Sequence, residues 1–147
     1  MQQLVIKRRL DVKKQTVAAL LAVIAAVALP QLLHLCGAMA GVGTKLGEIL
    51  LPMHAPILLV GLLAGPWAGA AAGICAPMLS FALTAMPRAS MLPFMMIELG
   101  TYGLCAGLMA KTKLPTLFRV LFAQIAGRAT RAVAILCATH LFSATAV

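Results

Sequence analysis

Acidic residues are scarce in this sequence, which has only three Asp or Glu among its 147 residues. All charged residues together make up 10% of the chain, against about 25% in an ordinary soluble domain, whereas 63% of the residues are hydrophobic. So few charges cannot cover the surface of a soluble domain of this size. The composition therefore excludes a soluble globular protein and predicts an integral membrane protein.

Catalytic and metal-binding motifs are missing as well. The four cysteines stand singly, with no CxxC pair and no histidine at ligand spacing, so neither a disulfide framework nor a zinc site is expected. No GxSxG or HExxH motif occurs. The stretch GVGTKLG (41–47) has the glycines of a phosphate loop, but its Gly-Thr-Lys order differs from the Gly-Lys-Ser/Thr of a P-loop. We therefore expect no enzyme activity, no cofactor and no metal.

Five apolar runs divide the chain, each close to or above the about 17–25 residues that cross a hydrocarbon core. They are 16–36, 49–65, 66–86, 91–110 and 114–142. The first lacks the small-residue cleavage site of a signal peptide, so it should remain as a helix. The sequence predicts an all-α fold in which a basic N-terminal segment, 1–15, precedes one transmembrane helical domain, 16–147. The second of its five helices is the shortest.

Positive charge is concentrated on one predicted side of the membrane. Five of the twelve cations lie in IKRRLDVKK (6–14) and two more lie between the last two runs, whereas the opposite loops hold only Lys45 and Arg88. This bias predicts a cytoplasmic N-terminus beside anionic lipid and an outer loop at 37–48. No stacking aromatics accompany the cations, so nucleic acid is not an expected partner. The glycines of the outer loop suit a flexible lid, with Lys45 and Glu48 as polar contacts.

Small residues recur at four-residue spacing in three of the runs. Ala18, Ala22 and Ala26 form one stripe on the first predicted helix, and such a stripe lets another helix approach closely in lipid. The spacing fits a docking surface and plain helix packing equally well. Glycines repeat the same spacing in two later runs, where packing within the bundle is the favoured interpretation. They are Gly65, Gly69 and Gly73, then Gly103 and Gly107.

Glu98 lies deep in the fourth run, within MLPFMMIELGTYGL (91–104). A charged residue at that depth costs about 2.5–3.5 kcal/mol on insertion scales, so it should have a partner. The fifth run offers Arg128 and Arg131. Counting about 1.5 Å of rise per residue from the helix ends puts Glu98 and Arg128 at similar depth. We predict that these two residues pair and that Arg131 stays free for a ligand. The alternative is that the pair only fixes the register of two helices.

Three further side chains are candidates for a pocket. His54 stands between two prolines, which interrupt helical hydrogen bonding, and an interrupted backbone at membrane depth is tolerated where it lines a cavity. Tyr102 lies one turn from Glu98 and could donate a hydrogen bond to it or to a ligand. Met95 could form an adaptable apolar wall. For each of the three, ordinary structural packing is the alternative.

These stretches together resemble the substrate-binding S component of energy-coupling factor (ECF) vitamin transporters, over about residues 16–142. The most specific pieces occur in a fixed order along the chain. They are Pro-Met-His-x-Pro at 52–56, Gly-Pro at 65–66, the Met-Pro that ends the third run, Glu-Leu-x-Thr-Tyr-Gly at 98–103 and Gly-Arg at 127–128.

The resemblance implies a bundle of six helices in a bacterial plasma membrane that captures a vitamin from the outside. The loop after the first helix would form the lid, with Lys45 and Glu48. The stripe of Ala18, Ala22 and Ala26 would be the docking face for a transmembrane coupling subunit, and two cytoplasmic ATPases would supply the energy.

We therefore predict a substrate-capturing subunit whose pocket is built from six residues: His54, Met95, Glu98, Tyr102, Arg128 and Arg131. Two arginines against one glutamate favour a carboxylate-bearing substrate such as pantothenate or folate, while a cobalamin-like corrinoid stays open.

The family has six helices and five runs are visible here, which leaves two alternatives. One is a truncated or structural subunit that binds no small molecule, and the other is a small secondary transporter coupled to protons through Glu98.

Overall fold

The computed structural model of the chain describes residues 12–39, 41, 53–85 and 87–145. All regular structure within these ranges is helical: α1 (Val12–Met39), α3 (His54–Ala64), α4 (Pro66–Thr84), α5 (Leu92–Met109) and α6 (Thr116–Thr145). Four of the helices are long and apolar enough to cross a membrane, and α3 is a shorter apolar helix. The predicted all-α membrane bundle is confirmed. Lys45, Glu48 and most of the basic segment lie outside the described residues.

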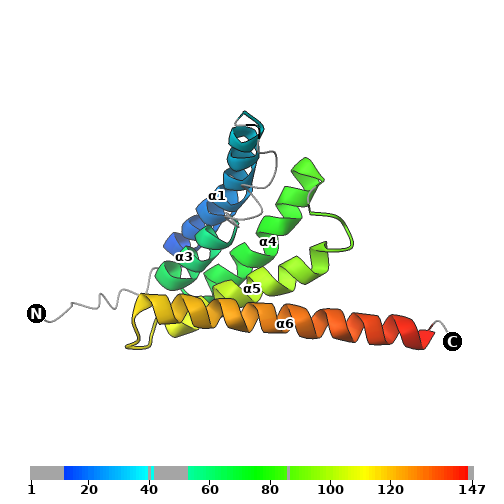
Figure 1. Ribbon diagram of the computed structural model, residues 1–147. Helices are drawn as coiled ribbons and strands as arrows, with labels where there is room; N and C mark the ends of the chain where they lie inside the picture. The colour runs from blue at the N-terminus through cyan, green and yellow to red at the C-terminus, as the bar shows by residue number, and fades with distance from the viewer. Residues whose placement is uncertain (1–11, 40, 42–52, 86, 146–147) are drawn as a thin grey trace, which may run out of the picture.

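Helix α5 is the centre of the bundle. It packs against α3, α4 and α6, while α1 packs against α3 and α4. In Figure 1, α1 and α4 rise side by side, whereas α6 runs obliquely to them along the opposite edge of the molecule. The largest fully buried side chains come from three of these helices: Ile57 of α3, Pro77 of α4, and Leu99 and Tyr102 of α5.

A single glycine separates α3 from α4. Gly65 has a φ of 110°, a backbone conformation that residues with a Cβ rarely adopt, and it ends α3 with a hydrogen bond to the carbonyl of Gly61. Pro66 follows as the first residue of α4, where its missing N–H costs nothing and its fixed φ suits the helix. This turn lies at the boundary that the sequence predicted between the runs 49–65 and 66–86.

Glycines bring the backbones of α4 and α5 into direct contact. A Cβ added to Gly69 would collide with the backbone of Gly103, and one added to Gly103 would collide with the backbone of Gly69. A Cβ added to Gly73 would likewise collide with the backbone carbonyl of Leu99. Packing of this kind holds helices together in lipid, where the hydrophobic effect does not act between them. The packing role predicted for these glycines is confirmed.

The alanine stripe of α1 faces the inside of the bundle. Ala22 and Ala26 are 7% and 0% exposed and belong to the hydrophobic core, and Ala18 is partly buried against it. Ala22 and Ala26 therefore pack within their own chain, and docking of a partner on the stripe stays a prediction. The physical reason for this packing is that their small side chains let α1 settle closely on α3 and α4 of its own chain.

The glycine contacts predict a difference between two substitutions on α5. Gly103→Ala and Gly100→Ala both add one methyl group and the same helix propensity. The new Cβ at position 103 meets the backbone of Gly69, which cannot move aside, whereas that at position 100 lies 3.1 Å from the flexible side chain of Ile74. We expect Gly103→Ala to be the less stable variant by about 1–3 kcal/mol, the usual cost of overpacking.

Unfolding in an SDS titration, followed by the helical circular dichroism signal of the detergent-purified protein, measures this difference. Equal stability of the two variants would mean that α4 and α5 are not in backbone contact at Gly103.

Candidate functional site

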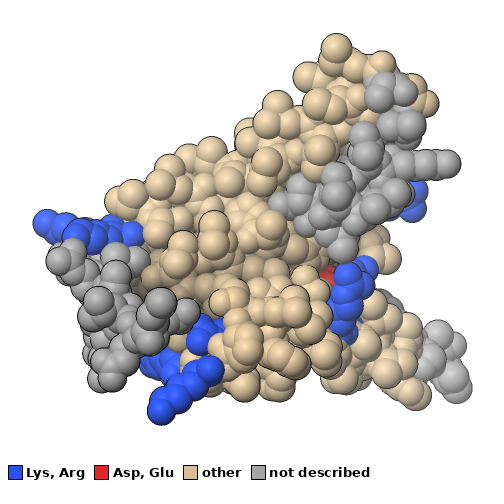
Figure 2. Space-filling view, turned by 60° about the vertical axis from the view of Figure 1, so that its left-hand side comes forward, with Lys and Arg blue, Asp and Glu red and all other residues tan. Residues whose placement is uncertain are grey.

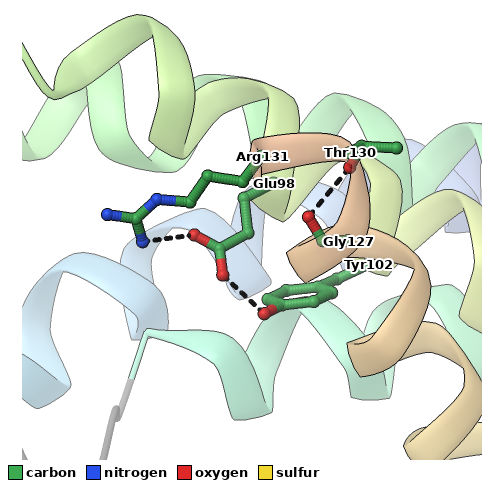
Figure 3. Close-up of polar contacts among 5 residues, drawn as sticks. All are labelled: Glu98, Tyr102, Gly127, Thr130 and Arg131. Carbon is green, nitrogen blue, oxygen red and sulfur yellow. Dashed lines mark hydrogen bonds and ion pairs between the residues drawn. The ribbon is translucent and has the colours of Figure 1, made fainter. Parts of the chain in front are cut away.

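Glu98 and Tyr102 lie one turn apart on α5 and are buried, with 2% and 0% of their surfaces exposed. Their spacing of four residues places both side chains on one face of the helix. The hydroxyl of Tyr102 donates a hydrogen bond of 2.6 Å to Oε1 of Glu98 (Figure 3). This bond satisfies one carboxylate oxygen inside an apolar bundle, where a buried acceptor without a partner is costly.

The other oxygen of Glu98 is bound from α6. Nη1 of Arg131 donates to Oε2 of Glu98 over 2.8 Å, and the Arg131 side chain is 36% exposed while that of Glu98 is 3% exposed. In Figure 2 a small red area of this carboxylate, the only acidic group among the described residues, lies directly beside blue side-chain atoms. Glu98 is thus neutralised by an arginine that extends toward the surface of the bundle.

The predicted pair between Glu98 and Arg128 is wrong, because the ion pair is made by Arg131. Counting depth from the helix ends assumes that α5 and α6 are parallel to one axis, and it ignores their rotation. The contact itself is set by Gly127, since a Cβ there would collide with the ring of Tyr102 and would lie 2.9 Å from the carbonyl oxygen of Glu98. Arg131 follows Gly127 by four residues and shares its face, whereas Arg128 is turned away by about 100°.

A groove of about 470 Å³ lies between α3 and α6, with Tyr102 of α5 at one point of its wall. The α3 side is apolar except for His54, and the α6 side carries several polar groups. The residues that line the groove are His54, Ala55, Leu58, Leu59, Leu62, Tyr102, Thr116, Val120, Gln124 and Arg128. Concave sites with a mainly apolar wall and a few polar groups are typical of small-molecule binding sites.

The rings of His54 and Tyr102 meet at one end of this groove. Their centroids are 5.1 Å apart and their planes are inclined by 51°, an arrangement of the kind that aromatic pairs prefer. Arg128 lies near the hydroxyl of Tyr102 and is exposed at the groove. A histidine, a phenol and a guanidinium are therefore gathered at one place, and the hydroxyl of Tyr102 connects them to the carboxylate of Glu98.

The structure divides the six predicted pocket residues into two groups. His54, Tyr102 and Arg128 line the groove. Glu98 and Arg131 form the ion pair beside it, and Met95 is partly buried against the hydrophobic core. Neither Met95 nor the ion pair lines the groove, and the arginine that was expected to be free for a ligand is the one that binds Glu98.

Sequence reasoning missed the wall that α6 contributes. Its members recur at every fourth residue, which places them on one face of the helix. They are Thr116, Val120, Gln124 and Arg128. The four-residue spacing is visible in the sequence, but the apolar composition of the whole run gave no reason to prefer this face to any other.

The ion pair predicts unequal effects for two neighbouring arginines. Arg131→Met and Arg128→Met each remove one positive charge from α6, but only the first leaves the buried carboxylate of Glu98 without its counter-ion. Removing one partner of a buried ion pair costs about 3–5 kcal/mol, and the partial exposure of Arg131 places the expected loss at the lower end of that range. Unfolding in an SDS titration measures both losses.

As a control, Glu98→Gln combined with Arg131→Met should recover part of the stability lost in Arg131→Met, since no uncompensated charge then stays buried. Equal losses for the two single arginine variants would contradict the assignment of the pair to Arg131.

A comparison with known protein families agrees with this architecture. The model of the family described as ECF transporter, substrate-specific component, matches residues 13–146. No curated protein and no solved structure gives a significant match. The family match covers nearly the whole chain and confirms the resemblance seen in the sequence. The chain belongs to the substrate-specific components of ECF transporters and is thus a multi-pass membrane subunit of a transporter rather than an enzyme.

Proposed function

We propose that this subunit captures a small water-soluble vitamin or related micronutrient from the outside of a bacterial plasma membrane, in the groove between α3 and α6. The observation that carries the proposal is the groove itself, which has a volume of about 470 Å³ and a polar end formed by His54, Tyr102 and Arg128. Sites for small ligands usually measure about 300–1,000 Å³, so the volume suits one vitamin-sized molecule.

The groove offers two kinds of contact to such a molecule. Leu58, Leu59 and Val120 supply apolar surface, which favours removal of the ligand's apolar parts from water. His54, Tyr102 and Arg128 supply hydrogen-bonding groups that fix its orientation. Capture from the outside is part of the proposal because, in the predicted topology, His54 begins α3 on the outer side, while Arg128 lies near the middle of α6.

Movement of the captured molecule requires partners. The sequence has no phosphate-binding loop, so the energy for import would come from other subunits. In this proposal a transmembrane coupling subunit and two cytoplasmic ATPases complete the importer. Docking through α1 is part of the same proposal, with Ala18 as the member of the alanine stripe that stays partly exposed.

The capture function predicts that blocking the groove removes the ligand. Leu59→Trp and Leu63→Trp place the same large side chain one turn apart on α3, at positions that are 57% and 67% exposed. Of these two leucines, Leu59 lines the groove and Leu63 does not. Denaturing mass spectrometry of the detergent-purified protein should show a stoichiometric small molecule in the unchanged protein and in Leu63→Trp, and a clear loss of it in Leu59→Trp.

An unchanged protein that folds but releases no small molecule, and that binds none from a mixture of vitamins, would contradict the capture function. Equal occupancy in the two tryptophan variants would place the ligand outside this groove.

The buried alanines predict how α1 takes part in assembly. Ala26 is 0% exposed, so Ala26→Leu should lower the stability of the isolated subunit by about 1–3 kcal/mol through overpacking. A docking contact at Ala26 would instead leave the isolated subunit stable and reduce its co-purification with the coupling subunit. SDS unfolding of the isolated subunit, together with co-purification from cells that express all the subunits, distinguishes the two roles.

A further inference from the structure

The groove between α3 and α6 has different chemistry at its two ends. His54 meets Tyr102 at one end, and Tyr102 is also the residue that packs on Gly127, next to Arg128. Toward the other end, Gly107 of α5 stands against Pro66, just after α3 has ended. The polar groups His54, Tyr102 and Arg128 therefore share one end, while leucine side chains line the groove along α3 away from it.

The groove is also elongated. Its α6 wall runs from Thr116 to Arg128, which lie twelve positions apart and are therefore separated by about 18 Å of helix at 1.5 Å per residue. The leucines at positions 58, 59 and 62 lie along the facing α3 wall, and Val120 lies between Thr116 and Arg128. A molecule that fills the groove is therefore long and narrow, with a charged end at Arg128 and a body that contacts the leucines of α3 on one side and Val120, Gln124 and Thr116 of α6 on the other. A compact corrinoid is larger than this volume.

The charged residues around the groove indicate which charge the bound molecule should carry at its polar end. The ten residues that line the groove include one arginine and no acid. The nearest carboxylate on α5, Glu98, has one oxygen bound to Tyr102 and the other to Arg131, so its charge is balanced outside the groove. Arg128 is thus left as the charged residue that lines the groove, where its exposed guanidinium attracts an anion.

From this geometry we infer that the substrate is an elongated, water-soluble carboxylate. Its carboxylate binds the guanidinium of Arg128 beside His54 and Tyr102, and its less polar body lies between the leucines of α3 and the α6 wall of Val120, Gln124 and Thr116. The inference rests on the proposed capture function and names the substrate class of that same groove. Arg128 determines specificity, whereas Arg131 is a positioning residue that holds Glu98 and Tyr102 in place.

Matched pairs of compounds test the charge directly. Pantothenate and panthenol differ only in that a carboxylate is replaced by an alcohol, and biotin and biotinol differ in the same way. Equilibrium dialysis of each radiolabelled compound against the detergent-purified full chain gives its affinity. We expect at least one acid to bind and its alcohol to bind about 10- to 100-fold more weakly, the effect of losing a hydrogen bond to a charged group.

Variants connect this preference to one residue. Arg128→Gln should remove most of the difference between acid and alcohol, and Arg128→Lys should keep part of it, since lysine retains the charge but not the planar fork of donors. Lys113→Gln removes the same charge at an exposed position between α5 and α6 and should leave the difference unchanged. Circular dichroism confirms that each variant is folded.

The outcomes separate this inference from the proposed function. If an alcohol binds as tightly as its acid, or if Arg128→Gln weakens acid binding no more than Lys113→Gln does, the anion assignment fails while capture stands. If the extracted protein carries a phospholipid in the groove in place of a water-soluble acid, the assignment also fails. If the folded protein binds neither acid nor alcohol and releases no small molecule, capture and the inference fail together.

Discussion

A carboxylate buried in an apolar bundle has to be neutralised where it lies, and the arrangement of α5 and α6 follows from that requirement. Glu98 accepts hydrogen bonds from Tyr102 on its own helix and from Arg131 on the next. The bond from Arg131 needs the two helices to be close, and Gly127 provides the space because the ring of Tyr102 occupies the place of its missing side chain. The ion pair and the glycine contact thus fix both the rotation and the register of α6.

The same backbone contacts explain why a groove exists beside a tightly packed centre. Glycines hold α3 and α4 close to α5, since Gly61 and Gly69 both approach the carbonyl of Gly103. Helix α6 packs on α5 from another side and runs obliquely to the rest of the bundle (Figure 1). Because α3 and α6 are each attached to α5, the space between them is left as a groove whose wall includes Tyr102.

Two arginines one turn apart on α6 have different surroundings for this reason. Arg131 shares the face of Gly127 and binds the buried carboxylate, whereas Arg128 is turned toward the groove with His54. Membership of the substrate-specific components of ECF transporters gives the general role of the chain. If Arg128 were paired with Glu98 in place of Arg131, the groove would have no arginine available to a ligand. The chemistry of the proposed substrate therefore depends on this division of roles between the two arginines.

The sequence by itself determined the helical membrane fold, the family, the Gly-Pro turn and the packing role of the glycines. These depend on local composition and on spacing along one helix, and both are visible in a single chain. It also selected Glu98, Tyr102 and His54, because polar groups in apolar runs stand out. Only the tertiary structure decided which arginine pairs with Glu98, which face of α6 lines the groove, and that Ala22 and Ala26 point inward. Those outcomes depend on how each helix is rotated about its axis and crosses its neighbours, and apolar helices with small residues on several faces do not specify this rotation until they are packed together.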